Sequence, residues 1–183
     1  MGKAGNFIDN DATLIRLTAM SQAYPYDAGV FIGRFQPYHL GHAQMLAHAL
    51  ESVRICVVVL GSAHQPPTPK NPFSWEVRAE MIRRSLRPEQ AGRVAFLPLR
   101  DYYDADRWAE ALRTGVAQAT AAPVGNVALI SHYKDASSAY LRWFPQWRTL
   151  AFPRQNDIDA TPLRDAFFAR IERGDTPVQA LED

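Results

Sequence analysis

The sequence has one cysteine, three lysines, no long apolar run and almost no net charge. Cys56 alone can form neither an intrachain disulfide nor a cysteine-based zinc site. It lies in the apolar run 55–60, far shorter than the roughly 20 residues that a transmembrane helix needs. The net charge of +1, from 20 basic and 19 acidic residues, argues against a protein held on DNA mainly by counterion release. The composition still allows small anionic ligands, which need only a local cluster of donors.

Signals for export or lipid attachment are also missing. Residues 1–10 contain no apolar core of a signal peptide. Gly2 suggests myristoylation, but Asn6 stands where that motif requires Ser or Thr. Cys56 is interpreted as a buried thiol in a reducing compartment. We therefore expect a cytoplasmic protein with neither a membrane nor a nucleic-acid partner.

The 183 residues, 47% hydrophobic and 21% charged, suit one domain with a short segment at each end. Residues 1–26 show no sustained period and are expected to form an extension, with one short helix around 12–20. From residue 28, β-branched runs alternate with amphipathic stretches. The candidate strands are 28–33, 54–61, 93–99, 126–131 and 147–152. Helical patterns cover 43–50, 75–86, a segment behind Asp104, and 136–143. In the last predicted helix, Thr161 is expected to be the N-cap and Gly174 to end the helix.

This alternation predicts an α/β fold, a Rossmann-like doubly wound parallel sheet of about five strands with helices on both faces. Ligands of such sheets bind outside the carboxyl ends of the strands. The residues that follow strands are therefore the candidates for function.

The first strand runs into Gly-Arg-Phe-Gln-Pro-Tyr-His-Leu-Gly-His, residues 33–42. Gly33 permits unusual backbone angles or close approach of a ligand, and Gly41 leaves room against the helix. His39 and His42 share a face at the helix start, where unpaired N–H groups and the helix dipole favour anions. With Arg34, they describe a polyphosphate site. The alternatives are capping or surface histidines, or a metal pair, for which no nearby Asp or Glu completes a ligand set.

His-x-Gly-His after the first strand of a parallel sheet is the signature of the nucleotidylyltransferase superfamily. The fuller string resembles the archaeal-type nicotinamide mononucleotide (NMN) adenylyltransferases, especially the adenylyltransferase domain of the bifunctional adenylyltransferase/Nudix hydrolases. The resemblance covers residues 29–168 and implies a nucleotidylyltransferase domain over 27–174, followed by a tail, 175–183. Class I aminoacyl-tRNA synthetases share a related histidine motif, but they need a Lys-rich second motif that is absent here. No Nudix box Gly-x5-Glu-x7-Arg-Glu is present, so no Nudix domain is expected.

The resemblance implies an acceptor site in the loops after the second and third strands. Gly61, Ser62 and Asn71 belong to a segment that closes over NMN, with Lys70 meeting its phosphate. Lys70 is alternatively a solvated loop residue.

After the third strand, the resemblance places the nicotinamide ring near Asp101, with Trp108 stacked on it. A cationic pyridinium on an indole is physically favourable. Trp108 also lies on a helical stripe with Leu112 and Val116, so a core aromatic is the alternative.

The residues expected to bind ATP lie at or after the ends of several predicted strands. Ile-Asp-Ala-Thr-Pro-Leu-Arg, residues 158–164, resembles the family's second signature, Ile-Ser-x-Thr-x-x-Arg. Asp159 replaces the usual Ser and receives no role. Segment 132–138 resembles the bifunctional subgroup, without individual roles. The expected ATP-binding residues are Gly33, Phe35, Gly41, Ser131, His132 and Thr161.

The resemblance implies the reaction NMN + ATP → NAD + pyrophosphate, by in-line attack on the α-phosphate. The expected catalytic residues, which stabilise the phosphate charge, are His39, His42, Arg34 and Arg164. Mg²⁺ accompanies the ATP phosphates, with few or no protein ligands. The sequence allows a homo-oligomer but does not fix the oligomeric state. The alternatives are nicotinate mononucleotide or another adenylyl or cytidylyl acceptor, and a non-catalytic nucleotide-sensing module.

Overall fold

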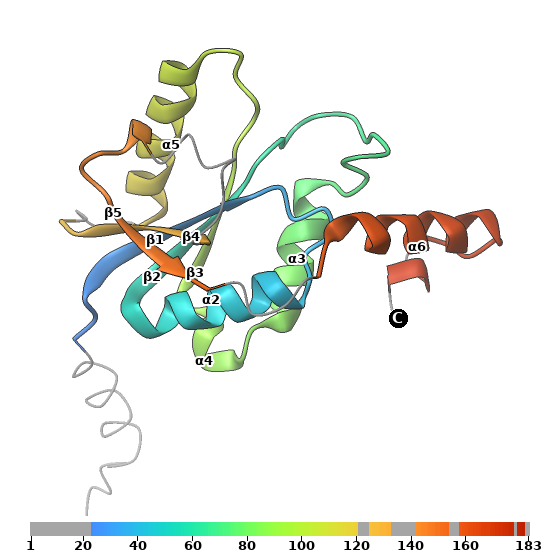
Figure 1. The fold of residues 1–183 in the computed structure, drawn as a ribbon, viewed down its shortest axis with the longest axis horizontal. Helices are drawn as coiled ribbons and strands as arrows, with labels where there is room; N and C mark the ends of the chain where they lie inside the picture. The colour runs from blue at the N-terminus through green and yellow to red at the C-terminus, as the bar shows by residue number, and fades with distance from the viewer. Residues whose placement is uncertain (1–22, 121–124, 133–141, 154–157, 178, 182–183) are drawn as a thin grey trace, which may run out of the picture.

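The computed structural model describes residues 23–120, 125–132, 142–153, 158–177 and 179–181. Its centre is a sheet in which every neighbouring pair of strands runs parallel, in the order β3-β2-β1-β4-β5 (Figure 1). The strands are β1 (Tyr26–Gly33), β2 (Val53–Leu60), β3 (Val94–Pro98), β4 (Val127–His132) and β5 (Arg148–Phe152). All five predicted strands form, with ends within two residues of the expected ones. The predicted fold class is confirmed.

The strand order reverses at β1. The chain moves outward through β2 to β3, then crosses back to β4 on the other side of β1. In Rossmann-like sheets, ligands bind outside the carboxyl ends of the strands near such a reversal. Gly33 pairs with Leu60, and Leu60 pairs with Pro98, so β1, β2 and β3 end level with one another. Their following loops start from one edge of the sheet, which we call the carboxyl edge.

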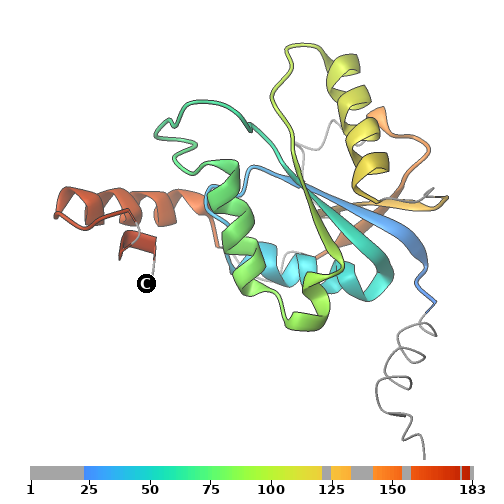
Figure 2. The same ribbon diagram turned by 180° about the vertical axis from the view of Figure 1, so that it is seen from behind.

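Helices cover both faces of the sheet (Figures 1 and 2). On one face lie α2 (Leu40–Ser52), α3 (Trp75–Ser85) and the short α4 (Pro88–Ala91), and on the other lies α5 (Ala105–Ala119). Strand side chains alternate between two cores. Phe31 and Val58 pack with α2 and α3, whereas Val30 and Val57 pack with α5. Because both faces are buried, the strands are near-continuous apolar runs.

The helix starts follow local capping chemistry. The Ser74 hydroxyl accepts a hydrogen bond from the Val77 amide (3.4 Å), and the Asp104 carboxylate accepts one from the Arg107 amide (2.8 Å). The four-residue α4 was not predicted, because it is too short to show a period. The helix expected at 12–20, and most of the one expected at 136–143, lie outside the described residues. No helix in the described part of the chain has the length and apolar character needed to cross a membrane.

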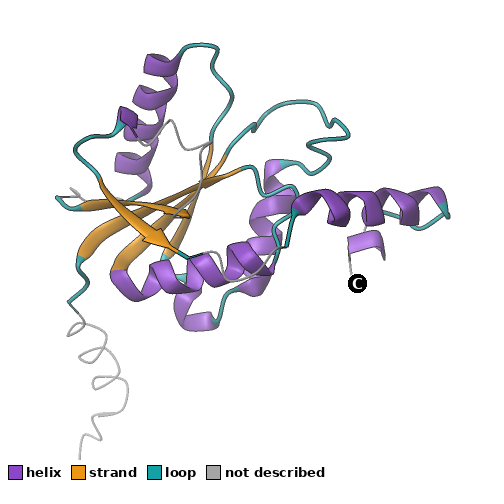
Figure 3. Ribbon diagram, in the orientation of Figure 1, coloured by secondary structure: helices purple, strands orange, loops and turns teal. Residues whose placement is uncertain are grey.

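Helix α6 (Ala160–Glu172) extends away from the sheet and is followed by the 3-10 turn η2 (Gln179–Leu181) (Figure 3). The prediction that Thr161 is its N-cap is wrong. Asp159 has the extended backbone of an N-cap (φ −112°), and its carboxylate accepts from the Thr161 amide at 2.9 Å. The acid two residues earlier supplies the acceptor, so Thr161 lies inside the helix. Gly174, with φ of +101°, follows the helix end as predicted.

Candidate active site

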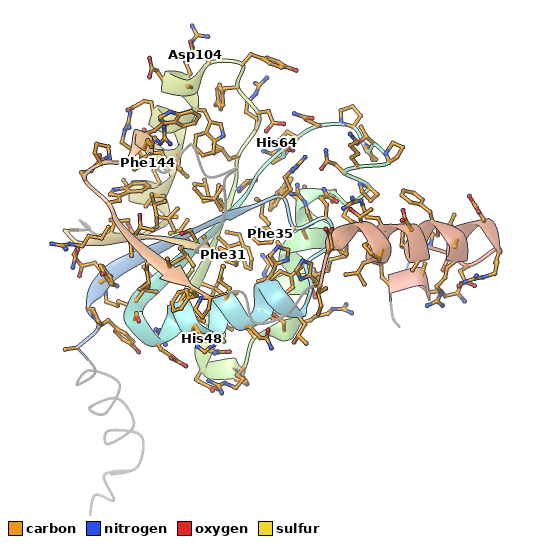
Figure 4. The ribbon with its side chains drawn as sticks, viewed as in Figure 1. Phe31, Phe35, His48, His64, Asp104 and Phe144 are labelled. Carbon is orange, nitrogen blue, oxygen red and sulfur yellow. The ribbon has the colours of Figure 1, made fainter. Side chains whose placement is uncertain are left out.

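The turn after β1 is held against the end of β2. The Gly61 amide donates to the Gly33 carbonyl at 2.9 Å. A Cβ on Gly33 would lie 2.7 Å from the Phe35 ring, so the turn needs glycine there. Phe35 has a positive φ of 50°, and its buried ring meets Phe31 edge-on, with centroids 5.2 Å apart (Figure 4). Arg34 is left exposed on the surface beside this anchored ring.

The two histidines of the first motif meet at the start of α2. His39 is the N-cap, and its ring centroid lies 3.7 Å from that of His42. The His39 amide donates to His42 Nδ1 at 3.4 Å, so a neutral His42 ring carries its proton on Nε2. Tyr38 stacks on His42, with centroids 5.7 Å apart. Gly41 is the second residue of the helix, which has no acid in its first turn. The helix start therefore combines two imidazoles with the positive end of a helix dipole.

Arg164 of α6 reaches the same turn. Its Nη1 donates to the Gln36 carbonyl at 2.7 Å, and its Nη2 donates to the Thr161 hydroxyl at 3.0 Å. The Gln36 side chain is buried and pairs with the backbone of Phe73, donating to its carbonyl (2.8 Å) and accepting from its amide (3.0 Å). The structure thus brings Arg164 and Thr161 to the turn that precedes the histidine pair.

A cavity of about 190 Å³ lies between the loop after β2 and the start of α3. Of the residues expected to bind the acceptor, Ser62 and Asn71 line it, and Lys70 is exposed on the same loop outside its lining. Ser62 has a positive φ of 50°. The Oδ1 atom of Asn71 is buried and has no hydrogen-bond partner among the described residues. The lining residues are Gln36, Ser62, His64, Gln65, Pro66, Pro67, Asn71, Phe73, Ser74, Trp75, Glu76 and Arg78.

The loop after β3 is tied to this cavity loop. Asp101 is exposed and accepts a hydrogen bond from the Gln65 side chain at 3.0 Å. The Ala63 amide also donates to the Leu99 carbonyl at 3.0 Å. Asp101 thus lies beside the loop that the acceptor is expected to occupy.

Trp108 lies in the first turns of α5 and is half-buried. Its ring meets Trp143 edge-on at 5.7 Å between centroids, and Phe144 lies 6.3 Å away. Trp108 is not in the lining of the cavity between the β2 loop and α3. The indole is at the edge of the core rather than within it.

The remaining ATP-side residues lie on β4, which is hydrogen-bonded to β1. Ser131 is buried, and His132 is the last residue of the strand, in register with Phe152. The His132 side chain and residues 133–138 lie outside the described residues.

Two buried polar residues at this edge were missed by the sequence analysis: Gln36 and Arg78. Arg78 is 1% exposed, and its guanidinium donates to three backbone carbonyls of the site loops. Burial lowers the pKa of Arg78, and the charges of Glu76 and Asp101 oppose that shift. A sequence signal was present, because Arg78 occupies an apolar-stripe position three residues after Trp75 and four before Ile82.

Within the described part of the chain, no three His, Cys, Asp or Glu side chains gather in a group able to hold a metal ion. A cation that arrives with a polyphosphate fits this site, because its ligands would be phosphate oxygens and water.

A family model described as cytidylyltransferase-like matches residues 30–142. The chain is 38% identical over 146 residues to the nicotinamide/nicotinic acid mononucleotide adenylyltransferase of Acinetobacter baylyi, covering 79% of this chain and 77% of that one. It is 32% identical over 110 residues to the nicotinamide-nucleotide adenylyltransferase of Saccharolobus solfataricus, covering 59% of this chain and 64% of that one.

A solved bifunctional NMN adenylyltransferase/ADP ribose pyrophosphatase from Francisella tularensis superposes with a TM-score of 0.70 at 34% identity, over 79% of this chain and 43% of that one. Its complex with AMP and a manganese ion gives a TM-score of 0.71 at 32% identity, over 86% and 45%. The chain thus spans less than half of these bifunctional proteins.

The parallel sheet and the histidine pair after its first strand define a nucleotidyltransferase, an enzyme class built on this fold. The chain belongs to the cytidylyltransferase-like family and, within it, to the nicotinamide-nucleotide adenylyltransferases.

Proposed function

We propose that the domain spanning residues 27–174 transfers the adenylyl group of ATP to NMN, giving NAD and pyrophosphate. The observation that carries the proposal is the His39–His42 pair at the start of α2, with ring centroids 3.7 Å apart, directly after the turn that Arg164 reaches. The names of the relatives support NMN as the acceptor. The adjoining cavity supports a second substrate at the same edge of the sheet.

The ATP phosphates lie against the start of α2. There the helix amides, the two imidazoles and Arg34 meet negative charge, and Arg164 approaches from α6. A phosphate oxygen of NMN attacks the α-phosphorus of ATP, and the bond between the α-phosphorus and its bridging oxygen to the β-phosphate breaks. The NMN phosphate is already ionised near neutral pH, so no general base is needed. The protein's task is to position the two phosphates and stabilise the departing pyrophosphate. Mg²⁺ would accompany ATP and offset the charge of its phosphates, with few or no protein ligands.

NMN lies across the loops after β2 and β3. Gly61, Ser62 and Asn71 hold the mononucleotide, and Lys70 meets its phosphate from the exposed side of the loop. The nicotinamide ring lies toward Asp101 and Trp108. The hydrogen bonds between the two loops, from Gln65 to Asp101 and from Ala63 to Leu99, support a single binding surface.

The decisive experiment is turnover by the purified protein with Mg²⁺, ATP and NMN, with NAD measured in a coupled alcohol dehydrogenase assay. Nicotinate mononucleotide is tested in parallel, with pyrophosphate release as the common readout, because one relative is named for both acceptors. We expect turnover with NMN. ATP binding without release of pyrophosphate with either acceptor would identify a nucleotide-sensing module instead and would overturn the proposal.

A further inference from the structure

Arg78 is a buried cation that pairs with backbone carbonyls. The side chain is 1% exposed, and its Nη1 donates to the carbonyls of Arg34 (2.6 Å) and Gly61 (2.8 Å). Its Nε donates to the carbonyl of Ser74 at 3.2 Å. A buried charge is costly unless hydrogen bonds replace its lost hydration, and three carbonyl dipoles do so here. Fixing these three carbonyls is the evident result of placing an arginine inside the apolar face of α3.

The three carbonyls belong to different parts of the site. Arg34 lies in the turn assigned to ATP, and Gly61 directly precedes Ser62 in the loop assigned to NMN. Ser74 caps α3 and lines the cavity. One guanidinium therefore links the backbones of both proposed substrate sites to Ser74, the N-cap residue of α3, at the edge of the cavity.

These bonds lie where the sheet itself stops holding the two loops together. The pairing of β1 with β2 ends at Gly33 and Leu60, and the last backbone bond is from the Gly61 amide to the Gly33 carbonyl. Beyond that bond the two segments diverge. The one after β1 leads into the histidine motif, and the one after β2 leads into the loop that lines the cavity. Arg78 supplies the next connection between them.

We propose that Arg78 is a positioning residue that sets the separation of the two substrate sites. The inference rests on the proposed function, because in-line transfer needs the attacking oxygen and the α-phosphorus about 3–3.5 Å apart. Arg78 also lines the cavity, but its Nε and Nη1 donate to backbone carbonyls and not to a ligand. Loss of the link is therefore expected to leave either binding site largely intact. The reaction between them is slowed, since a displacement of about 1 Å can cost on the order of 10²-fold in rate.

Arg93 provides a matched control. Its guanidinium also donates to three backbone carbonyls, those of Leu50, Val53 and Arg54. These lie at the end of α2 and the start of β2, at the opposite edge of the sheet from the site. Arg93→Met and Arg78→Met therefore remove similar bonds, and only Arg78→Met removes them from the site.

We compare wild type, Arg78→Met, Arg78→Lys and Arg93→Met by thermal unfolding, kcat at saturating substrates, and titration of ATP and NMN separately. Both methionine variants are expected to unfold at lower temperature. Arg78→Met is expected to lose about 10-fold or more in kcat, with each Kd within about 3-fold of wild type. Arg78→Lys recovers part of kcat because it keeps a cation and a donor. Wild-type kcat in Arg78→Met, or an equal loss in Arg93→Met, would overturn the proposal. If Arg78→Met does not fold, wild-type kcat in Arg78→Lys decides against it.

Hydrogen exchange separates failure of this inference from failure of the proposed function. Absence of NAD formation by the wild type would refute the proposed function alone. Exchange of the backbone amides of residues 34–36 and 61–63 needs no turnover. It is expected to accelerate in the Arg78 variants and to stay unchanged in Arg93→Met. Unchanged exchange in the Arg78 variants would reject the positioning role whatever the activity.

Discussion

The imidazole of His42 is held by other rings at the start of α2. Phe35 meets it edge-on at 4.9 Å between centroids, while Tyr38 and His39 lie alongside it. A ring held in this way needs little reorganisation when negative charge develops on pyrophosphate, and such preorganisation is the largest contribution in many enzymes. The same packing shows that His42 also fills space beside Phe35.

We expect His42→Ala to lower kcat by about 10²-fold or more while the protein still folds. His48→Ala is the matched control, because His48 lies on the same helix and stacks on Phe152, away from the turn after β1. Steady-state kinetics and circular dichroism of both variants make the test. Near-normal turnover by folded His42→Ala would show that the ring only packs.

Lys70 is exposed on the loop after β2. If it meets the NMN phosphate, Lys70→Ala raises KM for NMN and leaves KM for ATP unchanged, because the residues proposed to meet the ATP phosphates lie in the turn after β1 and on α2 and α6. Initial rates at varied concentrations of each substrate measure both constants, with Arg84→Ala, an exposed cation near the far end of α3, as control. A rise in KM for ATP would mean that the two substrates are reversed at this loop.

Among the elements, α5 carries the most ambiguous side chain. Trp108 lies over Trp143 and Phe144 without being buried, whereas Leu112 and Val116 of the same stripe are buried. A fully buried Trp truncated to Ala would cost about 3–5 kcal/mol of stability. For Trp108→Ala we expect a smaller loss, together with NMN binding weakened by about 1–2 kcal/mol, the size of a desolvated cation–π contact.

Denaturant unfolding and NMN titration of the same sample test this expectation. Trp147→Ala is the comparison, because Trp147 is half-buried and stacks on Phe144 at 4.5 Å. It should lose stability and keep its NMN affinity. Unchanged NMN affinity with a large stability loss in Trp108→Ala would assign that indole to the core.

The elements differ in how far the sequence predicted them. The strands were predictable because burial on both faces makes each one an apolar run, and Ser74 and Gly174 mark helix ends by local chemistry. The start of α6 was misassigned because Asp159 and Thr161 are both good caps, and Pro162 directly after Thr161 suits the first position of a helix. The deciding bond is the one from the Thr161 amide to Asp159.

The site was predictable where a motif lies within one segment, as with His39 and His42. Gln36 and Arg78 were missed because their partners are remote in the chain: Phe73 is 37 residues from Gln36, and Arg34 is 44 residues from Arg78. Hydrophobic periodicity assigns a position to the buried face of an element. It does not indicate which carbonyl a buried polar group will meet there.

The only cysteine of the whole molecule, Cys56, is buried on β2, between β1 and β3. Burial raises the pKa of the Cys56 thiol from 9.0 to about 12, and the charge of Arg93 opposes the shift. A raised folded-state pKa gives a stabilising contribution that is full below the unfolded pKa and is lost as the pH rises from 9 toward 12.

We therefore expect the free energy of unfolding of the wild type to fall above pH 9, by about 1 kcal/mol from this group at pH 10. Urea unfolding at pH 7, 9 and 10 measures the slope, and Cys56→Ala, which has no thiol, should show a shallower one. Tyr38, whose pKa burial raises to about 12, contributes to the slope in both proteins. Identical slopes would mean that the folded thiol ionises as readily as the unfolded one.

Gln36 sets a limit on how the sequence can drift during evolution. Its side-chain amide donates one hydrogen bond to the Phe73 backbone and accepts one from it, and its backbone carbonyl accepts a hydrogen bond from Arg164. A single residue therefore joins the turn after β1, the start of α3 and α6. Gln36→Glu would set a carboxylate oxygen against the Phe73 carbonyl, and Gln36→Lys would set a cation against the Phe73 amide. A viable lineage must therefore either keep an amide at this position or rebuild the three segments together, although no ligand need touch its side chain.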